Sequence, residues 1–278
     1  MSRTRRKKKN ILKNPVLWSV AGAILAMGLI LLCVFLFMDA ADSSRLQARK
    51  VEPTENTRQP YSPEDFVLNS DGFMECVGDI AYSTGIDVSF YQGDIDWEKV
   101  KADGVEFVFI RIGGRDGSDG SLYTDSMAQN YYEDAKAAGL EIGAYFFSQA
   151  ITEEEAREEA EFVLRQVKGW ELTRPIVFDW EYINQNARTA NMNKALLTQC
   201  TLAFCEVIEE AGEAPMIYFN ESQGKDLLDL DALRQYPFWL AMYGGELDVP
   251  YRVDYWQYSE TGNVDGIDHN VDLNIYLP

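Results

Sequence analysis

The stretch that decides the fold is PIVFDWEY, residues 175–182, an apolar run that ends in two acids. Side chains alternate between the two faces of a β-strand. Val177, Asp179 and Glu181 therefore share one face, and the apolar residues between them share the other. This pattern predicts a buried strand that packs on helices with one face and presents Asp179 and Glu181 together at its end.

Strand-like and helical segments alternate on both sides of this stretch. Five strand-like segments, each followed by a helical one, span 80–90, 106–114, 140–149, 174–182 and 214–219. Three more strand-like segments follow at 238–244, 253–259 and 271–277, with gaps too short for crossover helices. Alternating βα units indicate a parallel sheet with helices outside. A regular (β/α)8 barrel needs about 250 residues, and this region has about 200. We therefore predict an α/β fold: an irregular TIM-like (β/α) barrel with five βα units and three further strands.

The N-terminus has a different composition. Residues 1–15 are basic and residues 16–38 contain no charge, which is long enough for one transmembrane helix. An uncleaved signal anchor is the favoured interpretation, with cleavage within MDAADSS, after Ala41, as the alternative. The basic flank predicts a cytoplasmic N-terminus in the cell membrane. The polar, proline-containing residues 39–80 are expected to be an extracellular stalk, and residues 81–278 the extracellular folded domain.

Charge and residue counts exclude several classes of function. The first 38 residues carry a charge of +7 and the remainder carries −27, so nucleic acid is not an expected partner. His269 is the single histidine, and no G-x-S-x-G or CxxC spacing occurs. A Ser-His-Asp hydrolase and a zinc enzyme are therefore disfavoured. We expect no metal and no cofactor, and a monomeric domain.

Four acids fall at predicted strand ends. Asp87 ends the first strand, Asp179 and Glu181 end the fourth, and Asp272 begins the last. Active sites of such barrels lie at the C-terminal ends of the strands. Neighbouring carboxylates raise one another's pKa, which suits the acid that cleaves a glycosidic bond. Two alternatives are a Mg²⁺ or Ca²⁺ site and simple solvated surface acids.

Aromatic residues gather near the same strand ends. An aromatic ring offers an apolar surface that matches the CH face of a sugar. The candidate substrate-binding aromatics are Tyr145, Tyr218, Trp239, Tyr243 and Trp256.

Six motifs, in order, resemble the family 25 glycoside hydrolases, which are lysozymes (N-acetylmuramidases) of peptidoglycan. They lie at 85–101, 142–150, 175–181, 238–243, 254–267 and 270–274. The resemblance implies cleavage of the β-1,4 bond between N-acetylmuramic acid and N-acetylglucosamine. It assigns Glu181 as proton donor and Asp179 as its charged partner, with Asp87 and Asp272 in support. Gln257 lies within the fifth motif and is a further supporting candidate. One departure is His269, where the family commonly has glycine.

The rivals of this interpretation are an inactive cell-wall-binding module and a metal-dependent hydrolase that uses the same acids. If the enzyme interpretation holds, the partner is the peptidoglycan glycan strand. The predicted membrane helix would then hold the enzyme at the outer face of the cytoplasmic membrane for cell-wall remodelling.

Overall fold

The computed structural model describes residues 58–244 and 246–278, so the span expected at 16–38 lies outside the described residues. Within the described ranges, no helix is both long and apolar enough to cross a membrane. The elements, in chain order, are η3 (Pro63–Asp65), β1 (Phe66–Leu68), β2 (Met74–Cys76), β3 (Ser83–Val88), η4 (Phe90–Gln92), α2 (Trp97–Ala102), β4 (Phe107–Arg115), β5 (Leu122–Thr124), α3 (Ala128–Ala137), β6 (Glu141–Ser148), α4 (Glu153–Gln166), β7 (Ile176–Trp180), α5 (Lys194–Glu210), β8 (Pro215–Asn220), α6 (Glu221–Asp226), α7 (Leu230–Leu233), β9 (Phe238–Ala241), β10 (Tyr255–Gly262) and β11 (Val271–Tyr276).

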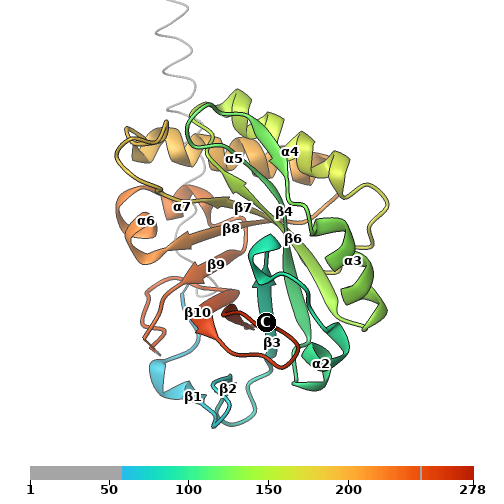
Figure 1. Cartoon of the computed structure of the whole chain (residues 1–278). Helices are drawn as coiled ribbons and strands as arrows, with labels where there is room; N and C mark the ends of the chain where they lie inside the picture. The colour runs from blue at the N-terminus through green and yellow to red at the C-terminus, as the bar shows by residue number, and fades with distance from the viewer. Residues whose placement is uncertain (1–57, 245) are drawn as a thin grey trace, which may run out of the picture. The chain divides into compact units, whose positions relative to one another are not determined.

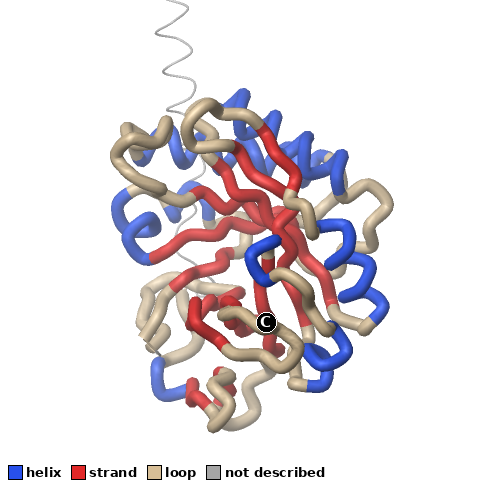
Figure 2. The backbone as a smooth tube through the Cα atoms, viewed as in Figure 1, coloured by secondary structure: helices blue, strands red, loops and turns tan. Residues whose placement is uncertain are grey.

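Eight of these strands close into a barrel in the order β3, β4, β6, β7, β8, β9, β10 and β11, with β11 pairing back to β3 (Figure 1). Each neighbouring pair from β3 to β10 is parallel. The short β5 adds to the end of β4 as an antiparallel edge strand. The predicted barrel of five βα units and three further strands is confirmed. Figure 2 shows the strands gathered inside and the helices outside.

The last strand runs against its neighbours. β11 is antiparallel to both β10 and β3. Its first residues therefore lie beside the last residues of the parallel strands, and Asp272 pairs directly with Asp87. This reversal is the reason that an acid at the start of a strand reaches the same barrel mouth as acids at strand ends.

Aromatic side chains fill the barrel interior. The buried cluster comprises Phe107, Phe109, Tyr145, Val177, Met216, Tyr218, Trp239, Ala241 and Tyr255. The rings of Phe109 and Trp239 stack with centroids 4.7 Å apart. Glycines on adjacent strands make room for the rings, because a Cβ on Gly143 would lie 2.3 Å from the Phe109 ring. The interior is therefore a packed core below the mouth, not a channel.

The helices cover the outer faces of the parallel strands. Thr152 and Asn193 are the N-caps of α4 and α5. Their side chains accept hydrogen bonds from the backbone N–H groups of Glu155 and Leu196, respectively. Phe178 of β7 packs outward on Phe204 of α5, with ring centroids 5.1 Å apart. Val177 lies in the interior cluster instead. The alternation read from residues 175–182 is thus confirmed.

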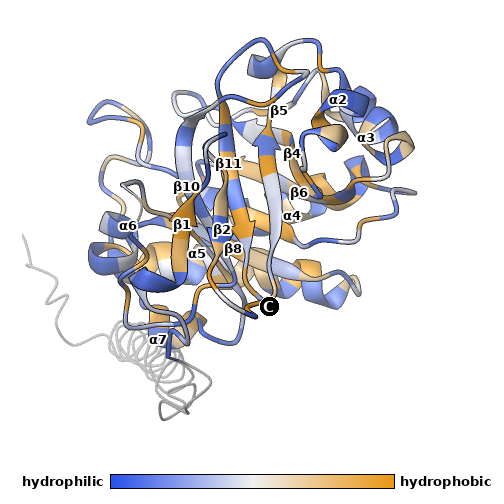
Figure 3. Ribbon diagram, turned by 90° about the horizontal axis from the view of Figure 1, so that it is seen from below, coloured by the Kyte–Doolittle hydropathy of each residue, from blue (hydrophilic) through white to orange (hydrophobic). Residues whose placement is uncertain are grey.

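A β-hairpin takes the place of a helix over β10, which corrects the expected domain boundary at residue 81. β1 and β2 pair as a hairpin inside the segment expected to be a stalk. Phe66 packs edge-on against Trp256, and the Met74 N–H donates to Tyr258 Oη at 3.1 Å. Figure 3 shows this hairpin beside β10 and β11. The outer face of β10 is apolar, and no helix in the described residues covers it. Burial of this apolar surface by the hairpin stabilises the hairpin in this position.

Candidate active site

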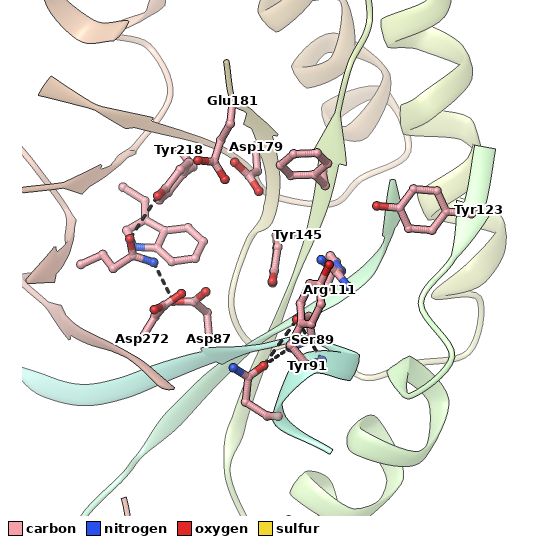
Figure 4. Close-up of a pocket in the computed structure, with 14 residues that line it drawn as sticks. Asp87, Ser89, Tyr91, Arg111, Tyr123, Tyr145, Asp179, Glu181, Tyr218 and Asp272 are labelled. Atoms are coloured by element: carbon pink, nitrogen blue, oxygen red, sulfur yellow. Dashed lines mark hydrogen bonds between the residues drawn. The ribbon is translucent and has the colours of Figure 1, made fainter. Parts of the chain in front are cut away.

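A pocket of about 360 Å³ opens at the C-terminal ends of the parallel strands (Figure 4). Its lining comes from most strands of the barrel and from the loops that follow them. The lining residues are Asp87, Ser89, Tyr91, Gln92, Arg111, Tyr123, Tyr145, Phe147, Asp179, Glu181, Tyr218, Trp239, Gln257 and Asp272. All four acids predicted from the strand ends are among them, although they come from three separate strands and one loop.

Most of the predicted supporting residues also reach this pocket. Tyr145, Tyr218, Trp239 and Gln257 line it. Tyr243 is half exposed and donates its hydroxyl to Gln257 Oε1 at 2.8 Å, so it lies at the rim.

Trp256 and His269 do not line the pocket. Side chains alternate along β10, so the neighbours of Gln257 point away from the interior. Trp256 is fully buried under the hairpin, and its indole N–H donates to the Met242 carbonyl at 2.8 Å. Its place in the structure is the outer core, not a substrate surface. His269 is exposed in the loop before β11.

A hydrogen-bond network fixes Asp87. Its Oδ2 accepts from Gln257 Nε2 at 2.9 Å and from Asn274 Nδ2 at 2.8 Å. Asn274 is itself held by the Trp239 indole N–H at 2.8 Å. The Gln257 Oε1 accepts from Tyr218 Oη at 3.0 Å. Because each amide uses both its donor and its acceptor, the carboxylate has little freedom to move.

The pKa of each of the four acids is raised, and burial is the largest cause in every case. Burial raises the pKa of Asp87, and the bonds from Asn274 and Gln257 and from the Asp272 carboxyl oppose that rise. Burial, the Asp87 charge and the bond to Asp87 raise the pKa of Asp272 to about 9. The carboxyls of Asp87 and Asp272 therefore share a hydrogen bond, and the pair holds a proton at neutral pH.

The two acids at the end of β7 are also shifted upward. Burial, followed by the charges of Asp87 and Glu260, raises the pKa of Glu181 to about 7. Burial and the Glu181 charge raise the pKa of Asp179, while Arg111 lowers it. Asp179 Oδ1 is buried and has no hydrogen-bond partner among the described residues. The end of β7 thus carries one acid that holds a proton near neutral pH and another with an unused acceptor.

Two buried glutamines hold the backbone that carries these acids. Gln223 Nε2 donates to the Trp180 carbonyl at 2.7 Å, and Gln149 Nε2 donates to the Glu181 carbonyl at 2.8 Å. Gln149 is fixed in turn by Thr189, whose hydroxyl donates to its Oε1 at 2.8 Å. These glutamines were not predicted from the sequence, because they come from helix α6 and from the loop after β6.

Arg111 was also missed, although a signal for it exists. It alternates with Phe107 and Phe109 along the apolar stretch 107–112, so it shares their inward face. A charged residue on the buried face of a strand is the same signal that singled out Asp179.

No group of three or more histidine, cysteine or acidic side chains in residues 58–244 and 246–278 has an arrangement that could hold a metal ion. The acids lie among hydrogen-bond donors and aromatic rings, as the lining of the pocket shows. The site is organised around protonated and hydrogen-bonded carboxyls.

The linked carboxyls predict a pH-dependent stability. A carboxyl whose folded pKa is raised stabilises the fold below its unfolded pKa, about 4, and loses that stability as pH rises through its folded pKa. For Asp272 the loss extends to about pH 9. Asp272→Asn should therefore raise the melting temperature relative to wild type more at pH 8.5 than at pH 5. Thermal unfolding at both pH values measures this, with the exposed Asp268→Asn as control. Equal effects at the two pH values would contradict it.

Comparison with known proteins agrees with this geometry. The model of glycosyl hydrolases family 25 matches residues 86–267. The chain belongs to glycosyl hydrolases family 25. The sequence-based resemblance to this family is thereby confirmed, and the matched range contains Asp87, Asp179 and Glu181 but ends before Asp272.

Relatives of this family 25 chain include two enzymes named lysozymes. It is 31% identical over 193 residues to the autolytic lysozyme of Clostridium acetobutylicum, covering 68% of this chain and 54% of that protein. It is 26% identical over 200 residues to lysozyme M1 of Streptomyces globisporus, covering 68% of this chain and 66% of that protein. The chain thus matches only about half of the Clostridium relative's length.

Solved structures agree on the fold. The lysozyme of Streptomyces coelicolor is 26% identical, with a TM-score of 0.58, and the match covers 71% of this chain and 93% of that one. The modular autolysin LytC of Streptococcus pneumoniae, solved with a synthetic peptidoglycan ligand, is 25% identical. Its TM-score is 0.63, and the match covers 76% of this chain and 52% of that one.

Proposed function

We propose that this protein is a peptidoglycan hydrolase, a muramidase that cleaves the β-1,4 bond between N-acetylmuramic acid and N-acetylglucosamine. The observation that carries the proposal is the pair of acids at the end of β7, buried Asp179 and half-buried Glu181, in an open pocket lined by tyrosine rings. Family 25 membership and the lysozyme names of the relatives support the same substrate class.

Glu181 acts as the general acid in this proposal. With its pKa raised to about 7, a substantial fraction of Glu181 is protonated at neutral pH. It donates that proton to the glycosidic oxygen as the C1–O bond breaks, and positive charge develops on the sugar ring. The leaving sugar departs as an alcohol, and Glu181 becomes a carboxylate that can later accept a proton from water.

Asp179 stabilises the charge that develops. Its partner-free Oδ1 is suited to accept a hydrogen bond from the N–H of the substrate's 2-acetamido group. The acetamido oxygen would then be placed to attack C1, as in substrate-assisted glycosidases. Asp87, Asp272 and Gln257 hold the neighbouring sugar hydroxyls.

The test is mass spectrometry of fragments released from purified peptidoglycan. Muramidase cleavage gives fragments whose new reducing end is N-acetylmuramic acid. Fragments that end in reducing N-acetylglucosamine would assign a different glycosidase, and the absence of any fragment would favour the wall-binding module.

The metal-dependent rival makes a separate prediction. The pocket is built from hydrogen-bonded carboxyls, amides and aromatic rings. We therefore expect that EDTA, followed by dialysis, leaves the rate of fragment release within about twofold of the untreated rate. A loss of activity that added Mg²⁺ or Ca²⁺ restores would support the metal-dependent reaction instead.

We also propose that the enzyme acts while tethered to the outer face of the cytoplasmic membrane through residues 16–38. The uncharged length of that segment and the basic residues before it support this location. Because β1 and β2 belong to the folded domain, the linker in this proposal is confined to residues 39–60. Fractionation of cells that produce the full chain, with a variant lacking residues 2–38 as control, tests it. Recovery of the protein from culture medium, cleaved after Ala41, would contradict the tether.

A further inference from the structure

Arg111 stands apart from the rest of the pocket. It carries the only positive charge among the described residues that line the pocket, in a site that holds four acids. Its side chain is 9% exposed. Its place on β4 puts it beside Tyr91 and Ser89, while Asp87 and Asp272 lie on the other side of Tyr145 in the view of Figure 4.

Three contacts hold the guanidinium in one orientation. Its Nε donates to Asp125 Oδ2 at 2.8 Å, and the Asp125 side chain is fully buried. The guanidinium carbon lies 5.0 Å from the Phe90 ring centroid and 5.3 Å from that of Tyr91. Asp125 is itself fixed by the backbone N–H groups of Phe90 and Met127. The donors of Arg111 are therefore preorganised.

A terminal nitrogen of this guanidinium remains available. Nη2 is buried and has no hydrogen-bond partner among the described residues, while the bond to Asp125 uses Nε. A buried cationic donor without a partner is costly unless a ligand supplies an acceptor. Tyr91 and Tyr123 line the pocket next to it and offer ring surface to a sugar.

We propose that Arg111 recognises the oxygen acceptor of the lactyl group on N-acetylmuramic acid. This inference rests on the proposed function. The lactyl group is the chemical difference between the two sugars of the glycan strand. It ends in an amide carbonyl where a peptide is attached and in a carboxylate where the peptide has been removed. A guanidinium fork donates to either oxygen group. Without Arg111, the acids of the pocket would repel the carboxylate form.

The experiment uses the full chain and three ligands. These are glycan strands with peptides attached, strands stripped of peptides by an amidase, and a chitooligosaccharide, which lacks the lactyl group.

The variant is the double substitution Arg111→Gln with Asp125→Asn, since it leaves no buried unpaired carboxylate. Arg111→Lys, which keeps the charge, and the exposed Arg165→Gln are the comparison variants. Melting temperatures identify any variant that fails to fold.

The expected result is selective. The double variant should lose about 10- to 100-fold in affinity for both muramic acid ligands, seen as a higher KM and in direct binding. Its affinity for the chitooligosaccharide should stay within about twofold of wild type. A larger loss on stripped strands would identify the carboxylate as the group recognised, and equal losses on the two would identify the carbonyl.

Two outcomes would overturn the inference. One is an equal loss on all three ligands, which would make Arg111 a general structural residue. The other is no loss on any ligand. Direct binding, measured in a Glu181→Gln background, keeps this test separate from the proposed function. If the wild-type protein releases no fragments with N-acetylmuramic acid at the reducing end, the proposed function is wrong. The binding comparison would still show whether Arg111 recognises the lactyl group.

Discussion

Glu181→Gln is expected to lower kcat on peptidoglycan by about 10²- to 10⁴-fold, the usual contribution of a general acid. Glutamine keeps the size of the side chain and its backbone carbonyl bond to Gln149, but it has no proton to give. The rate of reducing-end release from purified glycan strands measures the effect. Binding of the strands should change little, because the variant leaves the aromatic lining intact.

The pH profile sharpens this assignment. Glu181 must be protonated to act, and its pKa is raised to about 7, so kcat/KM of the wild type should fall as pH rises above about 7. The charge of Glu260 contributes to that raised pKa. Glu260→Gln should therefore move the fall to lower pH while leaving the rate at pH 5 unchanged.

Controls distinguish the acid role from general damage. Glu154→Gln, which changes an exposed residue of α4, should leave both rate and profile unchanged. A sugar substrate with a nitrophenolate leaving group needs little protonation, so Glu181→Gln should lose much less activity on it. Near wild-type rates of Glu181→Gln on peptidoglycan would rule Glu181 out as the proton donor.

Asp179→Asn is expected to lower kcat by about 10²- to 10³-fold, the magnitude typical of losing one preorganised charge contact in a transition state. The variant replaces a carboxyl oxygen that has no hydrogen-bond partner among the described residues with an amide group. Unlike Glu181→Gln, this loss should be as large on the nitrophenyl substrate, because Asp179 acts on the ring charge rather than on the leaving group.

The two variants together test the division of labour. Parallel rates on both substrates for both variants, measured with melting temperatures in hand, decide the assignment. If Asp179→Asn were rescued by the activated leaving group and Glu181→Gln were not, the two roles would have to be exchanged. The products of the wild type, followed by NMR, give the stereochemistry, and retention would agree with participation of the acetamido group.

The sequence alone was sufficient for the barrel and for the acids. Periodicity in residues 175–182 distinguished the helix-facing residues from the mouth-facing ones. This signal is local, because the two-residue period of a strand depends only on neighbours in the chain. Asp87, Asp179, Glu181 and Asp272 were all found from the ends of predicted strands.

Local signals also placed some residues wrongly. Trp256 was expected among the substrate aromatics because it lies near the end of a predicted strand. Whether a strand residue points in or out depends on the register of the whole strand. The outer face of β10 became a core only because the hairpin of β1 and β2 packs on it. That hairpin lay in a segment whose polar composition favoured a linker.

What the sequence by itself determined is the set of elements and the acids that end them, since the period of a strand is encoded between near neighbours. What only the tertiary structure decided is the chemistry of those acids. The Asp87–Asp272 pair depends on β11 running against β3, and the proton on Glu181 depends on burial and on charges from distant strands. The unused donors of Arg111 likewise emerge only when β4 meets the loop that carries Asp125. Burial and distance between strands are properties of the folded chain, so no stretch of the sequence contains them.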